Sequence, residues 1–147
     1  MFRNILVPTD GSAPSRKAIK RAVQLAKEQK ARITGFYVGP PWQLPAYSEY
    51  MPADIVSPKE HAAAVKKTAA RYLGAVKKAA DAARVPCRCS YVMGEHPYVE
   101  IVKAARRYGC DVIVIASHGR RGISRLLLGS ETSKVLAHAS VPVLVCR

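Results

Sequence analysis

The segment from Ala116 to Ser130 contains the residue types that most directly suggest chemistry. It holds Gly119, Gly122 and Gly129, and it lies between an apolar run and a short helical pattern. A glycine-rich loop that leaves a strand and enters a helix can direct several unpaired backbone N–H groups at one point, where phosphate is the usual ligand. The same glycines also suit tight turns and helix capping alone, so the spacing leaves both interpretations open.

Asp10 is the second candidate, because it follows the first apolar run of the chain. In an open α/β sheet, ligand groups are carried at the carboxyl ends of the strands, and Asp10 has that position. An aspartate between a strand and a helix is also a common turn or capping residue. Its position alone does not decide between the two roles.

His118 is the titratable side chain next to the predicted phosphate loop, and a hydrogen-bonding loop residue is a more common role for it than a general base. Arg120, Arg121 and Arg125 are either exposed loop residues or charge-assisted contacts to phosphate. The sequence shows no Walker-type Gly-x-x-x-x-Gly-Lys pattern and no Gly-x-Ser-x-Gly elbow. We therefore assign no catalytic residue.

An alternation of strands and helices must position these candidates. Apolar runs and helical periodicity predict strands at 3–7, 32–38, 86–93, 111–116 and 141–146, and helices at 13–30, 58–84, 98–108 and 131–138. Ser57, Pro58 and Glu60 form a capping-box pattern, and Pro142 indicates that the last strand lies at an edge. This order is typical of a parallel α/β sheet.

Two features carry no assigned role. The connection at 39–57 is rich in proline and aromatic residues, and it is either a variable solvent loop or a lid or partner surface. Cys87, Cys89, Cys110 and Cys146 lack zinc-site spacing, so we expect them to be reduced and mostly buried. Cys87 and Cys89 would share one face of a strand, which leaves a redox role open.

Length and charge limit the class of protein. The 147 residues suit one domain, 1–147, and no apolar run is long enough for a membrane helix or placed as a signal peptide. We therefore expect a cytoplasmic protein without a membrane partner. The net charge of +14 attracts polyanions, but the even scatter of Lys and Arg and the absence of a recognition motif make nucleic-acid binding the weakest hypothesis.

Three separated segments resemble the universal stress protein family. They are Ile5 to Ser12, Asp111 to Gly119, and Leu127 to Ser130 together with Val141 to Val145. The resemblance implies an open five-stranded parallel sheet of order 3-2-1-4-5 with helices on both faces, a Rossmann-like α/β fold. It also implies a homodimer formed through the last strand, Val141 to Cys146.

The ATP-binding branch of that family carries Gly, two residues, Gly, nine residues, and then Gly followed by Ser or Thr. Gly119, Gly129 and Ser130 match this pattern, whereas Ala116 stands where the first glycine is expected. A methyl group there is tolerated if the backbone stays extended, and it obstructs the ribose or phosphates if the backbone φ must be positive.

The resemblance implies an adenine-nucleotide site with two ends. The adenosine end consists of Pro8, Thr9, Asp10 and Val38. The phosphate end consists of Ala116, His118, Gly119, Gly129 and Ser130 with the N–H groups of Glu131 and Thr132. The Glu131 carboxylate either competes for this helix end, because it can satisfy the helix dipole itself, or points to solvent.

The ligand implied is ATP, with ADP or AMP as alternatives and Mg²⁺ arriving only with the nucleotide. The function implied is a stress-response regulatory protein with at most slow ATP hydrolysis. A dimeric stress or interaction module that does not retain nucleotide is the alternative.

Overall fold

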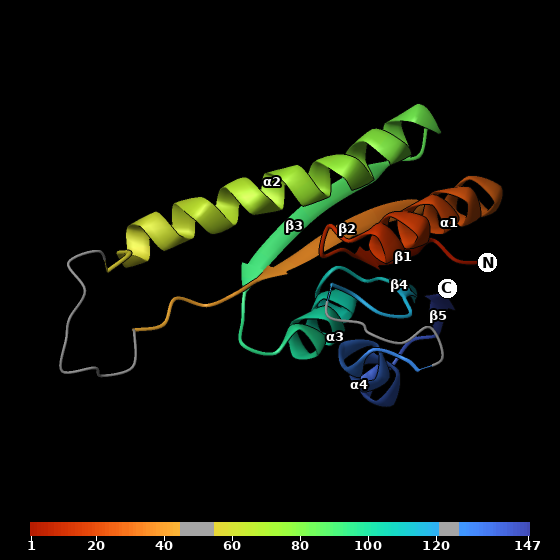
Figure 1. Ribbon diagram of the computed structural model, residues 1–147. Coiled ribbons are helices and arrows are strands. Elements are labelled where there is room, and N and C mark those ends of the chain that lie inside the picture. The colour runs from red at the N-terminus through yellow and green to blue at the C-terminus, as the bar shows by residue number, and fades with distance from the viewer. Residues whose placement is uncertain (45–54, 121–126) are drawn as a thin grey trace.

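The computed structural model describes residues 1–44, 55–120 and 127–147, which form alternating strands and helices (Figure 1). The elements in chain order are β1 (Asn4–Pro8), α1 (Ala13–Gln29), β2 (Arg32–Gly39), α2 (Pro58–Ala82), β3 (Cys87–Met93), α3 (Pro97–Arg107), β4 (Val112–Ala116), α4 (Ser130–His138) and β5 (Val143–Cys146). Every strand and helix predicted from the sequence is present, and no end differs from its predicted position by more than two residues.

The five strands form one parallel sheet in the order β3-β2-β1-β4-β5, which confirms the predicted topology. β1 lies in the middle, with Ile5 aligned with Ile33 of β2 on one side and Val112 of β4 on the other. The strand order reverses between β1 and β4, and their carboxyl ends are adjacent. Such a switch point is where open α/β sheets bind ligands.

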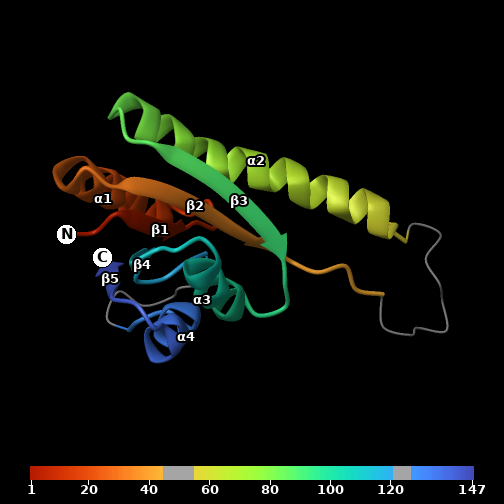
Figure 2. The ribbon, with the colours of Figure 1, turned by 180° about the vertical axis from the view of Figure 1, so that it is seen from behind.

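The helices cover the two faces of the sheet in pairs. α1 and α2 lie on one face and α3 and α4 on the other, as the two opposite views show (Figures 1 and 2). Ile5 and Val114 face the first pair, whereas Leu6 and Ile113 face the second. β1 and β4 are buried along their whole length, so they form a rigid base for the loops that follow them.

The helix ends follow the local sequence. Ser57 and Glu60 form the predicted capping box at the start of α2, and Ser12 accepts a hydrogen bond from the Ser15 N–H at the start of α1. Gly109 follows α3 with φ +61°, the left-handed conformation expected for a glycine at that position.

Asp111 fastens the amino ends of the central strands. Its carboxylate oxygens accept hydrogen bonds from the backbone N–H groups of Arg3 at 2.8 Å and Asn4 at 3.1 Å. The Asn4 side-chain oxygen in turn accepts a hydrogen bond from the buried Thr34 hydroxyl of β2 at 2.9 Å. These polar groups fix β1, β2 and β4 together at the end of the sheet opposite the loops of interest.

The prediction of mostly buried cysteines is confirmed for Cys110 and wrong for Cys89. Cys110 is buried, Cys87 and Cys146 are half-buried, and Cys89 is exposed. Among the described strands β3 lies at one edge of the sheet, and every one of its residues is half-buried or exposed.

The connection after β2 is described only at its two ends. The Trp42 indole N–H donates a hydrogen bond to the Val56 carbonyl at 2.9 Å, which holds these ends together. The central part, 45–54, lies outside the described residues, so its predicted role stays a prediction. Within the described part of the chain, no helix is long and apolar enough to cross a membrane.

Candidate functional site

The turn after β1 is held by the side chain of Thr9. The Thr9 N–H donates to the Phe36 carbonyl at 2.9 Å, which continues the sheet by one residue. Its buried hydroxyl oxygen accepts hydrogen bonds from the Gly11 N–H at 3.2 Å and from the Ser15 hydroxyl at 2.7 Å. Thr9 therefore fixes the backbone on which Asp10 is carried.

Asp10 joins the loops that follow β1 and β4. One carboxylate oxygen accepts the Ser12 N–H at 3.0 Å and the other accepts the Arg120 N–H at 3.0 Å. A Cβ atom on Gly119 would lie 2.3 Å from that second oxygen, so Gly119 must be a glycine for this contact to form. Asp10 thus has the turn role that the sequence left open, and in addition it brings the two predicted halves of the site together.

The loop after β4 is closed at its base by Ser117 and Gly129. The Gly129 N–H donates to the Ser117 carbonyl at 2.7 Å, and a Cβ atom on Gly129 would lie 3.0 Å from the His118 Cα. The His118 Nδ1 and the Ser117 hydroxyl form a hydrogen bond of 2.9 Å. His118 therefore acts as a hydrogen-bonding loop residue, the more common of its two predicted roles. Arg121 and Arg125 lie outside the described residues.

Ala116 ends β4 in a regular strand conformation. It is buried and aligned with Cys146 of β5, and its backbone φ is not positive. A methyl side chain therefore causes no backbone strain at the position where the resemblance expects glycine.

α4 begins at Ser130 after the N-cap residue Gly129, and among the described residues no side chain caps this helix end. The buried Thr132 donates its hydroxyl hydrogen to the Ala116 carbonyl at 2.8 Å, which holds this helix end against the end of β4. Ser130 is exposed at the first helical position. The N–H groups of the first turn have no partner within the helix, so they are available to an anion.

The Glu131 carboxylate does not compete for that helix end. One of its oxygens accepts a hydrogen bond from the Tyr98 N–H at 2.9 Å, so it caps the start of α3 instead. The other oxygen lies 3.5 Å from the Lys134 ammonium group. No pattern in the sequence predicts this arrangement, because it depends on how α3 and α4 pack.

Arg120 turns toward α2, a direction that the sequence does not predict. Its side-chain Nε–H donates to the Asp10 carbonyl at 3.0 Å, and its guanidinium lies over the Tyr72 ring at 4.9 Å from the centroid. A cavity of about 360 Å³ opens there, on the α1–α2 side, and three arginines line it: Arg16, Arg71 and Arg120. Among the predicted site residues, Thr9 lines this cavity.

The ring of Tyr37 packs edge-on against Tyr72, which lines this cavity, with ring centroids 5.3 Å apart. Burial raises the pKa of the Tyr37 phenol above its ordinary value. The nearby Arg120 charge opposes that rise, and Asp10 adds to it. The phenol therefore stays neutral at physiological pH.

The predicted residues form a connected set around the switch point. Pro8 ends β1, while Val38 lies on the neighbouring β2 and packs toward α3 and α4. The structure brings Asp10 against Gly119 and Thr132 against Ala116. In 1–44, 55–120 and 127–147, no group of three or more His, Cys, Asp or Glu side chains could hold a metal ion.

Comparisons with known proteins all point to one family. The sequence model of the universal stress protein family matches residues 1–147. Universal stress protein YxiE of Bacillus subtilis is 35% identical over 151 residues, covering 100% of both chains. A solved structure of protein MJ0577 of Methanocaldococcus jannaschii superposes with a TM-score of 0.82 at 27% identity, covering 99% of this chain and 96% of that one.

Two more distant structures share the fold and contain adenine nucleotides. One is a universal stress protein in complex with cAMP, at 22% identity and a TM-score of 0.69. The other is an Arabidopsis thaliana family protein with AMP bound, at 17% identity and a TM-score of 0.68. Each aligns with at least 98% of this chain and 90% of its own.

Proposed function

This chain belongs to the universal stress protein family, and from that premise we propose that it binds an adenine nucleotide between the carboxyl ends of β1 and β4. The ligand we propose is ATP, with ADP or AMP as alternatives, and Mg²⁺ would enter with the nucleotide. The proposed role is regulatory, with at most slow hydrolysis of ATP. The structures of this fold that hold cAMP and AMP support the class of ligand.

The N-terminus of α4 is the observation that carries this proposal. α1 and α2 are capped by their own serines, and α3 is capped by Glu131. Among the helices of the described residues, α4 alone begins without a side-chain acceptor for its first N–H groups. A phosphate group satisfies such donors and is favoured by the helix dipole.

Asp10 and Val38 support the placement of the adenosine end. Each Asp10 oxygen already accepts one backbone N–H and keeps capacity for a second hydrogen bond, which a ribose hydroxyl or an adenine amino group can supply. Val38 offers a half-buried apolar side chain at the end of the adjacent strand. A polar and an apolar group that suit an adenosine thus lie toward the carboxyl ends of two adjacent strands.

Calorimetric titration tests the proposal directly. The reduced protein is titrated with ATP, ADP and AMP, each with and without Mg²⁺, and with GTP as the control for the base. We expect one adenine nucleotide per chain and weaker binding of GTP. Mass spectrometry of small molecules released from the denatured, freshly purified protein checks the identity of the nucleotide. Absence of adenine-nucleotide binding at millimolar concentration would contradict the proposal and favour the interaction module.

We also propose that two chains associate through β5. β5 forms one edge of the sheet, and its Leu144 side chain is 42% exposed beside α1. Val143 and Val145 pack partly on the core, so charging them would disturb the monomer as well as a dimer. Leu144 is therefore the better position for a test.

Light scattering on Leu144→Lys tests this association. Tyr91→Lys is the matched control, because Tyr91 is 37% exposed on β3, the opposite edge of the sheet. We expect a dimeric wild type, a monomeric Leu144→Lys protein and a dimeric Tyr91→Lys protein. A dimeric Leu144→Lys protein would show that assembly uses another surface.

A further inference from the structure

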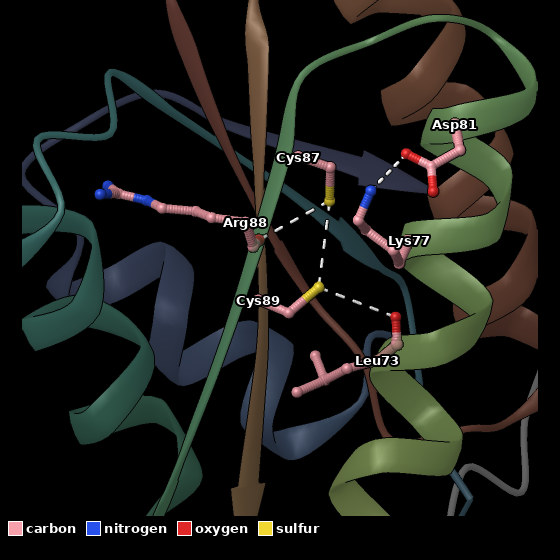
Figure 3. Close-up of polar contacts among 6 residues, drawn as sticks. All are labelled: Leu73, Lys77, Asp81, Cys87, Arg88 and Cys89. Carbon is pink, nitrogen blue, oxygen red and sulfur yellow. Dashed lines mark hydrogen bonds and ion pairs between the residues drawn. The ribbon is translucent and has the colours of Figure 1, made fainter.

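Cys87 and Cys89 form a pair of neighbouring thiols where β3 packs against α2. Both side chains project from the same face of the strand toward the helix (Figure 3), and their sulfur atoms lie 3.9 Å apart. Cys87 is half-buried and Cys89 is exposed. The pair is therefore preformed and open to solvent, and the nucleotide proposal does not use it.

The sheet opposes a disulfide bond between these two residues. Alternate residues of a strand have Cα atoms roughly 6.6 Å apart, near the upper limit of about 6.8 Å for a disulfide. Cys87 and Cys89 are aligned with Ile33 and Gly35 of β2, so β3 cannot shorten without disturbing this pairing. The sulfurs would also have to move from 3.9 Å to about 2.05 Å.

We propose that Cys87 and Cys89 bind one monovalent copper ion, Cu(I), as a pair of thiolate ligands. Two metal–sulfur bonds of about 2.3 Å that span 3.9 Å enclose an angle of about 116°, which suits trigonal or tetrahedral coordination. Each sulfur forms one bond to the ion and releases its proton to solvent, so no electron is transferred.

The number and type of ligands favour this ion. In the described part of the chain, no third His, Cys, Asp or Glu side chain completes a metal-binding cluster. Structural zinc sites use four protein ligands, whereas soft thiolates select Cu(I). A water molecule or a small thiol from solution completes the coordination at the exposed side.

The neighbouring charge also suits the complex. Two thiolates and one Cu(I) ion carry a net charge of −1, and the ammonium group of Lys77 faces the pair from α2 (Figure 3). Lys77 is held by an ion pair with Asp81 on the next turn of the helix. The Leu73 carbonyl lies 3.7 Å from the Cys89 sulfur, so this thiol is oriented before an ion arrives.

Anaerobic competition with a chromophoric Cu(I) chelator tests the proposal. The reduced wild-type protein is titrated into the chelator–Cu(I) complex, and loss of chelator absorbance measures the ion transferred. We expect one Cu(I) per chain, and at least a hundred-fold loss of affinity in Cys87→Ser and in Cys89→Ser. Cys110→Ser and Cys146→Ser are the matched controls, and both should bind as the wild type does.

Three results would overturn the proposal. The first is a wild-type protein that takes no Cu(I) from the chelator. The second is a Cys110→Ser or Cys146→Ser protein that loses Cu(I) binding as strongly as Cys87→Ser and Cys89→Ser do. The third is a wild-type protein whose mass decreases by two hydrogens on exposure to mild oxidant, because the two thiols then form a disulfide readily. Circular dichroism melting confirms that each variant is folded. ATP binding by Cys89→Ser, measured in parallel, should match the wild type, so failure here is distinct from failure of the nucleotide proposal.

Discussion

Replacing Ser130 by proline removes one of the proposed phosphate donors of α4 without breaking the helix. Ser130 is the first residue of α4, and proline lacks an N–H but has the φ that suits this position. The chain already begins α2 with Pro58 and α3 with Pro97. Gly129 has φ −59° and ψ 150°, the extended conformation that a residue before proline prefers.

The expected loss of affinity follows from the bond that disappears. A hydrogen bond to a charged group contributes about 1.5 to 3 kcal/mol, so Ser130→Pro should bind ATP about 10- to 150-fold more weakly. Ser130→Ala removes the hydroxyl and keeps the N–H, so its ATP affinity should fall less. The difference between the two variants measures the contribution of the backbone N–H. Because proline also restricts the unfolded chain, the free energy of unfolding of Ser130→Pro should lie within about 1 kcal/mol of wild type.

Calorimetry with ATP on wild type, Ser130→Pro and Ser130→Ala measures this effect, and urea unfolding verifies that the proteins are folded. Equal affinity of the proline and alanine variants would refute the placement of phosphate at α4. Arg71→Gln then locates the alternative, because Arg71 lines the arginine cavity on the other face of the sheet. Gly129→Val is less informative, since its side chain would meet His118 even without a ligand.

The remaining predictions concern thiol reactivity and backbone strain. A hydrogen bond from the Cys89 thiol lowers the pKa of Cys87, whereas burial raises the pKa of Cys110. Iodoacetamide should therefore modify Cys87 first as pH rises toward neutrality, and peptide mass mapping should find Cys110 modified last. In urea unfolding, the free energy of unfolding of Gly109→Ala should be about 1 kcal/mol lower than that of wild type. The φ of +61° alone causes this loss, because a Cβ there meets no atom within 4 Å. Gly11→Ala should lose more, since its φ is +75° and its Cβ would lie 2.2 Å from a tyrosine ring of α2.

The order of strands and helices could be predicted because it is encoded locally. The apolar run at 111–116 indicates a buried central strand, and the capping box at Ser57 marks the start of α2. Pro142 correctly indicates an edge, because β5 borders the sheet. The 3-2-1-4-5 order came from the resemblance, since alternation alone does not fix which strands are neighbours.

The contacts that shape the candidate site could not be predicted, because they join residues far apart in the chain. Asp10 meets Arg120 across 110 positions, and Glu131 reaches back 33 positions to cap α3. The direction of the Arg120 side chain depends on its contact with the Tyr72 ring of α2. Cys89 is exposed on a strand at the edge of the described sheet, and periodicity does not report which strand takes that position.

The hydrogen bonds between the Asp111 carboxylate and the backbone of Arg3 and Asn4 affect the order in which the chain folds. It joins β4 to the Arg3 backbone over 108 positions of sequence, whereas β1, β2 and β3 follow one another along the chain. Closing so long a loop is entropically costly and slow relative to local pairing. During synthesis, the edge of β1 that pairs with β4 therefore stays unpaired until residues 111–116 have been made, so this edge is covered later than the edge that pairs with β2.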